Sequence, residues 1–192
     1  MGAWEQALFE VPGVPTSDAV LSGCGRYRYR LTRTWDPGQQ RATFIMLNPS
    51  TADAADDDPT IRRCTSYARS WGLGGLTVVN LYAYRATDPA DLWKVDDPVG
   101  PDNDDHLRAV LTPATAVGAP VVAAWGANAR LDRVAEVMGF AGTVTALGLT
   151  KSGQPRHPLY LPKGAQRFRW AMSLMPQPDE TGSVRPGTRR GR

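Results

Sequence analysis

Four short apolar segments constrain the fold of this 192-residue chain more than any other feature. They span residues 42–47, 76–81, 121–125 and 143–147. Short, continuous apolar runs of this kind are typical of strands buried on both faces, and helical patterns separate them. Alternating strands and helices predict a mostly parallel sheet with helices on both faces. We therefore predict an α/β fold, a three-layer α/β/α arrangement around a central, mostly parallel, four-stranded sheet.

Weaker patterns complete the expected element order. Residues 26–35 alternate basic and apolar side chains, which favours a half-buried strand. Asp58 and Pro59 are suited to the N-cap and first position of a helix. One face of that helix would carry Ile61, Cys64, Ala68 and Trp71. Further helices are predicted over residues 104–111, 127–138 and 166–174, with long loops over 83–103 and 148–164.

The length of the chain is that of one domain. We predict an irregular or partly helical lead-in over residues 1–25 and a single α/β domain over 26–175. Residues 176–192 are polar, basic and contain Gly and Pro, so we predict a disordered tail there.

Composition narrows the class of protein. No segment approaches the roughly 18 apolar residues of a membrane span, and the first ten residues lack the apolar run of a secretory signal. The two cysteines, Cys24 and Cys64, form no metal-binding spacing and are expected to be free thiols in a reducing compartment. We expect a cytoplasmic monomer without a cofactor or a membrane contact.

Charge is unevenly distributed along the chain. Residues 48–105 contain eleven acidic and five basic residues, whereas residues 150–192 contain nine basic and two acidic ones. The basic quarter is either a surface that faces a polyanion or a tail of no consequence. Only three of the 22 basic residues are Lys, which suits phosphate recognition by Arg but also follows from genome composition.

Ligands of parallel sheets bind at the carboxyl ends of the strands. Here these ends carry Asn48-Pro49-Ser50, Asn80 and Trp125-Gly126, and the last loop carries His157. Asn48 can hold a water or a substrate carbonyl, or can be an ordinary turn residue before Pro. Asn80 can pair with the edge of a base, or can satisfy loop backbone.

The charged and titratable candidates also have two interpretations. His157 is a possible electrophile or acid, or a surface loop residue. His106 is expected to be solvated at a helix start. The run Asp53, Asp56, Asp57 and Asp58 is either a divalent metal site or a solvated acidic loop.

The strand-end segments, taken in order, resemble the motifs of the uracil-DNA glycosylase superfamily. They read Met46-Leu47-Asn48-Pro49-Ser50, Val78-Val79-Asn80, Ala124-Trp125-Gly126 and His157-Pro158-Leu159. Met46 stands where the superfamily has Gly, and the last motif is shorter than its H-P-S-P-L. The chain also resembles a bacterial family of unknown function, marked by LNPSTAD and PRHPLY.

The superfamily resemblance implies a role for each segment. Asn48 would position the attacking water, Asn80 would read the base, and His157 would stabilise the leaving base. Asp53 would supply an additional carboxylate. Met46, Pro49, Ser50, Trp125 and Gly126 would line the base pocket. DNA contacts would come from Arg156, Pro158, Leu159, Tyr160, Lys163 and Arg167, with Leu159, Tyr160 or Leu161 as a wedge.

Three functions follow as hypotheses. The first is a DNA glycosylase-like enzyme that acts on a base, modified or not, in DNA or on a nucleotide. The second is a metal-dependent nucleotide hydrolase that uses the loop from Asp53 to Asp58. The third is a non-catalytic module that binds nucleic acid or a modified base. An iron–sulfur cluster, present in some glycosylases, is excluded by the two cysteines.

Overall fold

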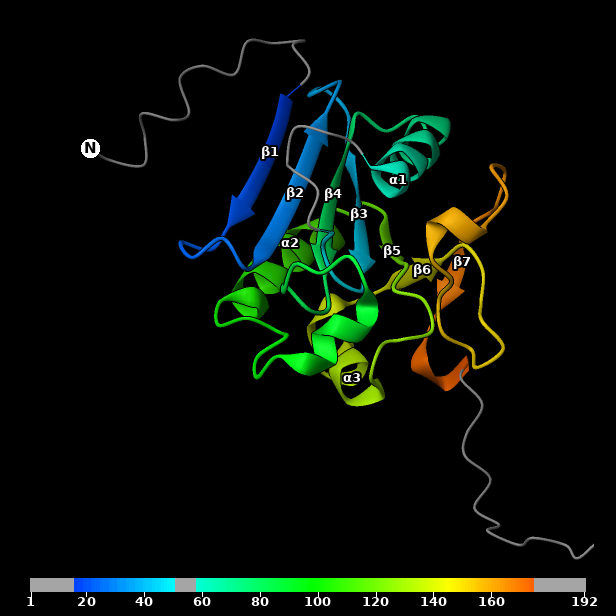
Figure 1. The fold of residues 1–192 in the computed structure, drawn as a ribbon. Coiled ribbons are helices and arrows are strands. Elements are labelled where there is room, and N and C mark those ends of the chain that lie inside the picture. The colour runs from blue at the N-terminus through cyan, green and yellow to red at the C-terminus, as the bar shows by residue number, and fades with distance from the viewer. Residues whose placement is uncertain (1–15, 51–57, 175–192) are drawn as a thin grey trace, which may run out of the picture.

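The computed structural model describes residues 16–50 and 58–174. Within this part of the chain one sheet contains seven strands in the order β1-β2-β4-β3-β5-β6-β7 (Figure 1). The strands are β1 (Thr16–Leu21), β2 (Arg28–Thr34), β3 (Arg41–Met46), β4 (Gly75–Asn80), β5 (Val121–Ala123), β6 (Val144–Ala146) and β7 (Phe168–Trp170).

The centre of the sheet confirms the expected parallel arrangement. The four apolar segments form β3, β4, β5 and β6, and each neighbouring pair among them is parallel. β2, expected as a half-buried strand, pairs with β4 in antiparallel orientation. The sheet is larger than predicted, because β1, β2 and β7 extend the parallel core at both edges and make the sheet mixed.

Two predictions at the edges of the sheet were wrong. Residues 16–21 are not an irregular lead-in but β1, which pairs with β2. Most of β1 is exposed, so it lacks the apolar alternation that identifies a strand. The segment expected as a closing helix instead forms β7 and the 3₁₀ helix η4 (Met172–Leu174). Trp170 explains this, because its buried ring packs edge-on against Trp125 and its indole donates to the carbonyl of Gly153.

Helices cover both faces of the sheet. They are α1 (Pro59–Ser70), α2 (Asn103–Ala116) and α3 (Leu131–Ala141), with the 3₁₀ helices η2 (Pro89–Lys94) and η3 (Pro158–Tyr160) in the loops. α1 starts as predicted: the carboxylate of Asp58 accepts from the backbone N–H of Ile61 at 2.9 Å, and Pro59 opens the helix. α2 is longer than predicted, and α3 begins at Leu131 rather than at residue 127.

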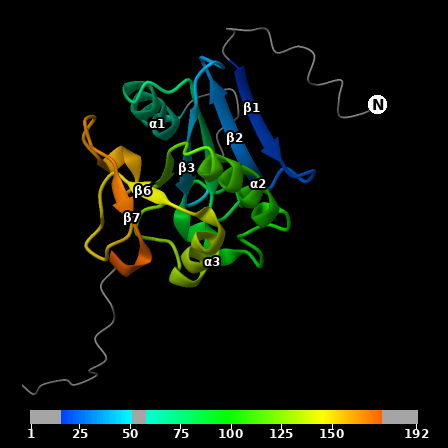
Figure 2. The same cartoon turned by 180° about the vertical axis from the view of Figure 1, so that it is seen from behind.

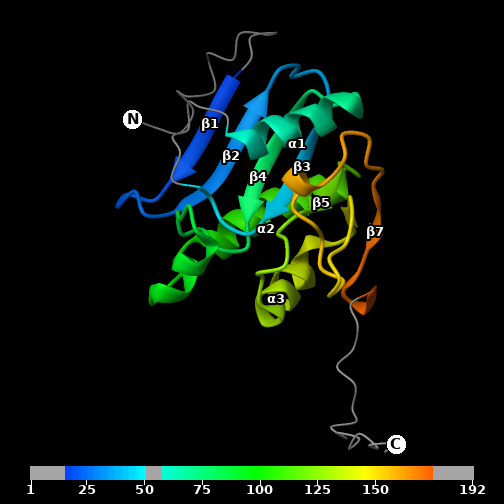
Figure 3. The same ribbon diagram turned by 45° about the vertical axis from the view of Figure 1, so that its right-hand side comes forward.

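Strand alternation divides the core into two layers. Phe44 and Met46 of β3 pack on the side of α1, whereas Ile45 packs with α2 and α3. Figure 3 shows α1 in front of β4 and β3, and Figure 2, from behind, brings α2 forward. The described residues thus form three layers, as predicted. None of their helices is long and apolar enough to cross a membrane.

The strand order produces a switch point at β3. The chain leaves β3 through α1 to reach β4 on one side, and leaves β4 through α2 to reach β5 on the other side of β3. Crevices at such points, at the carboxyl ends of the strands, are where doubly wound α/β sheets bind ligands. Cys24 and Cys64, which lie elsewhere, are free as expected, the first exposed and the second buried.

Candidate functional site

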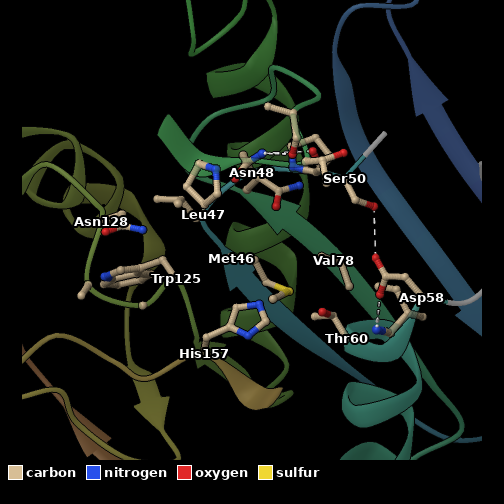
Figure 4. A pocket seen from close by; sticks show the side chains of 18 of the residues that line it. Met46, Leu47, Asn48, Ser50, Asp58, Thr60, Val78, Trp125, Asn128 and His157 are labelled. Carbon is tan, nitrogen blue, oxygen red and sulfur yellow. Dashed lines mark hydrogen bonds between the residues drawn. The ribbon is translucent and has the colours of Figure 1, made fainter. Parts of the chain in front are cut away.

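A pocket of about 470 Å³ opens at this switch point (Figure 4). It lies between the carboxyl ends of the parallel strands, the start of α1 and the loop that carries His157. The structure brings together ten of the predicted site residues in its lining: Met46, Asn48, Pro49, Ser50, Asn80, Trp125, Gly126, Arg156, His157 and Tyr160. Segments more than 100 residues apart in the sequence therefore form one site.

Asn48 is held in a fixed orientation. Its side-chain Nδ2 donates to the carbonyls of Pro49 at 3.1 Å and Ala86 at 2.8 Å. The backbone N–H of Ala86 donates back to the Pro49 carbonyl at 3.0 Å. Since carbonyls only accept, the amide hydrogens are committed to the backbone, and Oδ1 remains as an acceptor for a water or a ligand.

Asn80 is the last residue of β4. Its side chain lies on the same face of the sheet as that of Val78, the face that α1 covers. The residue is only 2% exposed and lines the pocket, and its amide atoms are not among the fully buried side-chain atoms of the described residues that lack a partner, so the amide is open to the pocket. Its backbone carbonyl, by contrast, accepts from Asn103. Asn80 thus offers an amide donor and acceptor to the pocket.

His157 caps η3 and lies in the pocket beside Met46 (Figure 4). Its Nδ1 accepts from the backbone N–H of Leu159 at 3.4 Å, which places the proton of the neutral ring on Nε2. Burial lowers the pKa of His157, and the carboxylate of Asp58 opposes this only in part. The imidazole is therefore neutral at neutral pH and can donate one hydrogen bond through Nε2.

The lowered pKa of His157 predicts how stability depends on pH. The unfolded chain binds this proton more readily than the folded one, so the free energy of unfolding falls as pH drops through the usual histidine range near 6.5. His157→Gln should lose less stability than the wild type between about pH 8 and about pH 5.5 in urea unfolding.

His106→Gln is the matched control, because it removes the only other histidine. The His106 ring stacks on the ring of Tyr29, with 4.6 Å between the ring centroids, and neither residue lines the pocket. If the His157→Gln curve keeps the full wild-type pH dependence, burial does not control the protonation of His157.

The loop that carries His157 is attached to the end of β5. The backbone N–H of Gly126 donates to the carbonyl of Pro155 at 2.8 Å, and Gly126 has a φ of 82°, a conformation that favours Gly. Trp125 touches the pocket, but its indole donates to Gln154 at 2.9 Å and its ring packs against Trp170. Trp125 therefore holds the loop in place rather than presenting its ring to a ligand.

Among the residues that the structure describes, the acidic loop forms no metal site. Asp53, Asp56 and Asp57 lie outside the described residues. Both carboxylate oxygens of Asp58 are in use, one as the helix cap and one accepting from the hydroxyl of Ser50 at 3.1 Å. Within residues 16–50 and 58–174 no three His, Cys, Asp or Glu side chains are grouped to hold a metal ion.

The residues predicted to contact DNA separate into two groups. The first group, Arg156 and Tyr160, lines the pocket, and Tyr160 is 71% exposed. The second group, Leu159 and Lys163, is exposed outside the pocket.

Two of these predictions do not fit the structure. Pro158 and Leu161 are buried in the core, so neither is available as a contact or wedge. Arg167 is exposed outside the pocket, with its guanidinium over the ring of Trp71 at 4.4 Å, and its predicted phosphate contact stays a prediction.

Sequence reasoning missed Arg28, Thr60 and Asn128, which also line the pocket. Arg28 is 7% exposed, and burial together with the nearby Arg85 lowers its pKa. The alternation of residues 26–35 indicated solvent-facing basic side chains. No sequence signal identifies Arg28, because it reaches the pocket only through the pairing of β2 with β4.

The mixed sheet, its two helical layers and the pocket at the switch point define an α/β protein with a pocket at the strand ends. The chain belongs to the family described as "Protein of unknown function (DUF1643)", which it matches over residues 28–159. That range includes every pocket-lining residue except Tyr160. No curated protein matches the chain.

Proposed function

We propose that this chain is a DNA glycosylase-like protein that receives a base, modified or unmodified, in the pocket and cleaves its N-glycosidic bond. The observation that carries the proposal is that the amide of Asn80 and the neutral imidazole of His157 line the same pocket at the strand ends. An amide can pair with a base edge in both directions, as donor and acceptor. The pocket volume of about 470 Å³ is suited to a small organic ligand.

Each polar group then has one task. Asn80 pairs with the base edge, and the Nε2–H of His157 donates to a base carbonyl, where negative charge develops as the bond breaks. Oδ1 of Asn48 accepts from a water and directs its oxygen at the sugar carbon. The new C–O bond replaces the C–N bond, the electron pair leaves with the base, and the proton of the water passes to solvent.

Asn48 makes this a slow enzyme. An amide orients a water but takes up no proton, so general-base catalysis, which typically contributes 10²–10⁴-fold, is absent at this position. Met46 in place of Gly narrows the pocket beside His157, which favours a base other than uracil. The same ordered strand-end motifs that resemble the uracil-DNA glycosylase superfamily form the pocket, which supports a fold of that type.

The test is a panel of oligonucleotides that carry uracil, hypoxanthine, hydroxymethyluracil or bulkier adducts, each in single-stranded and duplex form. Excision is measured as strand cleavage after alkali, and binding by fluorescence anisotropy at low salt. We expect excision of at least one base, unaffected by chelator.

The other outcomes separate the alternatives. Tight binding without product identifies a non-catalytic module. Turnover of nucleotides that requires Mg²⁺ or Mn²⁺ and is lost with chelator identifies a metal-dependent hydrolase that uses the Asp53–Asp58 loop. Neither cleavage nor binding of any oligonucleotide would refute the proposal.

A further inference from the structure

An aromatic side chain lies near the pocket on a segment that the proposed chemistry does not use. Trp93 belongs to η2 and is 37% exposed, and the guanidinium of Arg130 lies over its ring at 4.1 Å. The segments that carry these two residues also line the pocket, through Pro89 and through Asn128. We name Trp93 and Arg130 together the stacked pair.

The stacked pair is fixed to the same core as the pocket. The ring of Trp93 meets that of Tyr82 edge-on at 5.2 Å, and the Tyr82 hydroxyl accepts from the backbone N–H of Arg130 at 3.3 Å. Tyr82 itself is buried, and its backbone N–H donates to the carbonyl of Leu47, next to Asn48. The pair is therefore held at a set position relative to the pocket.

The spacing along the chain places the pair near the pocket rim. Trp93 follows Pro89 by four residues of 3₁₀ helix, a rise of about 8 Å. Arg130 follows Asn128 by two residues, at most about 7 Å of extended chain.

We propose that the stacked pair holds the base next to the one in the pocket, and that the ligand is single-stranded nucleic acid. This inference rests on the proposed function and adds the state of its substrate. Base stacking on aromatic rings and on Arg planes is the usual way to bind single strands, and it accepts any base. A paired base in a duplex has its faces covered by its neighbours, so the stacked pair favours a strand whose bases are free.

Another Arg–aromatic contact of the chain does not share this position: Arg108 lies over Phe140 at 4.6 Å, on α2 and α3, and neither helix lines the pocket. Arg108, like Arg130, is exposed. Arg108→Ala is therefore a matched control for Arg130→Ala. Each variant removes one positive charge and one guanidinium that lies over an aromatic ring.

The experiment measures the affinity of the full chain for a fluorescent oligothymidylate and for a duplex of equal length at low salt. We expect tighter binding of the single strand. Trp93→Ala should weaken it about tenfold, Trp93→Phe much less, and Arg130→Ala more than Arg108→Ala. Thermal unfolding shows whether each variant is folded. If Trp93→Ala is not folded, the test uses Trp93→Phe and Arg130→Ala.

Each contrary result has one meaning. Equal affinity for duplex and single strand, or full affinity in Trp93→Ala, overturns the inference. If a mononucleotide binds and depends on Asn80 while Trp93 has no effect, the proposed function stands without it. If single strands bind through Trp93 but no base is distinguished or excised, the inference stands and the proposed function fails.

Discussion

Asn80→Ala is expected to lower base excision or base-specific binding by about 100- to 10,000-fold, measured as kcat/KM or as affinity on the preferred oligonucleotide. A site built around a hydrogen-bonding pair loses this much when one partner is missing. Asn80 is only 2% exposed and lines the pocket.

The same variant should not lose stability. The amide of Asn80 opens into the pocket, so its removal should change the free energy of unfolding by less than about 1 kcal/mol. Loss of function without loss of stability distinguishes a ligand-binding Asn from a structural one. Urea unfolding and the binding assay on the same preparation measure both quantities.

Asn103→Ala is the matched control for Asn80→Ala. Asn103 is fully buried away from the pocket lining; its Oδ1 has no partner among the described residues, but its Nδ2 donates to the backbone carbonyls of Asn80 at 3.1 Å and Leu81 at 3.2 Å. Its removal should cost about 1–3 kcal/mol of stability. If Asn80→Ala is as destabilising as Asn103→Ala and binding is unaltered, Asn80 is part of the scaffold only.

Gly74→Ala is expected to destabilise the protein by about 3 kcal/mol, which lowers Tm by about 6 to 12 °C for a domain of this size. A Cβ at Gly74 would overlap the backbone carbonyl of Asp36 and lie 2.8 Å from Cβ of Gln39. Backbone cannot rotate away as a side chain can. The carbonyl of Gly74 also accepts from the N–H groups of Trp35 at 2.8 Å and Asp36 at 2.9 Å, so any shift disturbs the turn between β2 and β3.

Gly139→Ala is the matched control for Gly74→Ala. Gly139 lies within α3, and a Cβ there meets no atom within 4 Å. Ala in place of Gly inside a helix stabilises by about 0.5–1 kcal/mol, so the two variants should shift Tm in opposite directions. Equal shifts for both would contradict the steric argument at Gly74.

The parallel core and α1 could be predicted because their signals are local. Apolar runs marked β3, β4, β5 and β6, and the Asp58-Pro59 cap marked the start of α1. β1 and β7 could not be predicted, since each is an edge strand that exists through pairing with one neighbour. The residues of β7 have no strand pattern of their own, and the contact of Trp170 with Trp125 overrides the helical tendency of that segment.

The site was partly predictable for a similar reason. Asn48, Asn80 and His157 follow strands or start a Pro-marked loop, and the rule for parallel sheets places such positions at one edge. No local sequence pattern identifies Arg28 or Trp93 as residues at or near the site. Arg28 reaches the pocket through an antiparallel pairing, and Trp93 lies near its rim because η2 folds against Tyr82.

The amino-acid sequence by itself determined which residues form buried strands, where α1 starts and which polar side chains stand at strand ends. Periodicity, capping and proline positions act over a few residues, so they can be read without knowing the neighbours. Only the tertiary structure decided which of those side chains keep a free hydrogen-bonding group. The amide hydrogens of Asn48 bond to the carbonyls of Ala86 and Pro49, the indole of Trp125 donates to Gln154, and the amide of Asn80 opens into the pocket. That difference depends on contacts between distant segments, which no local pattern encodes.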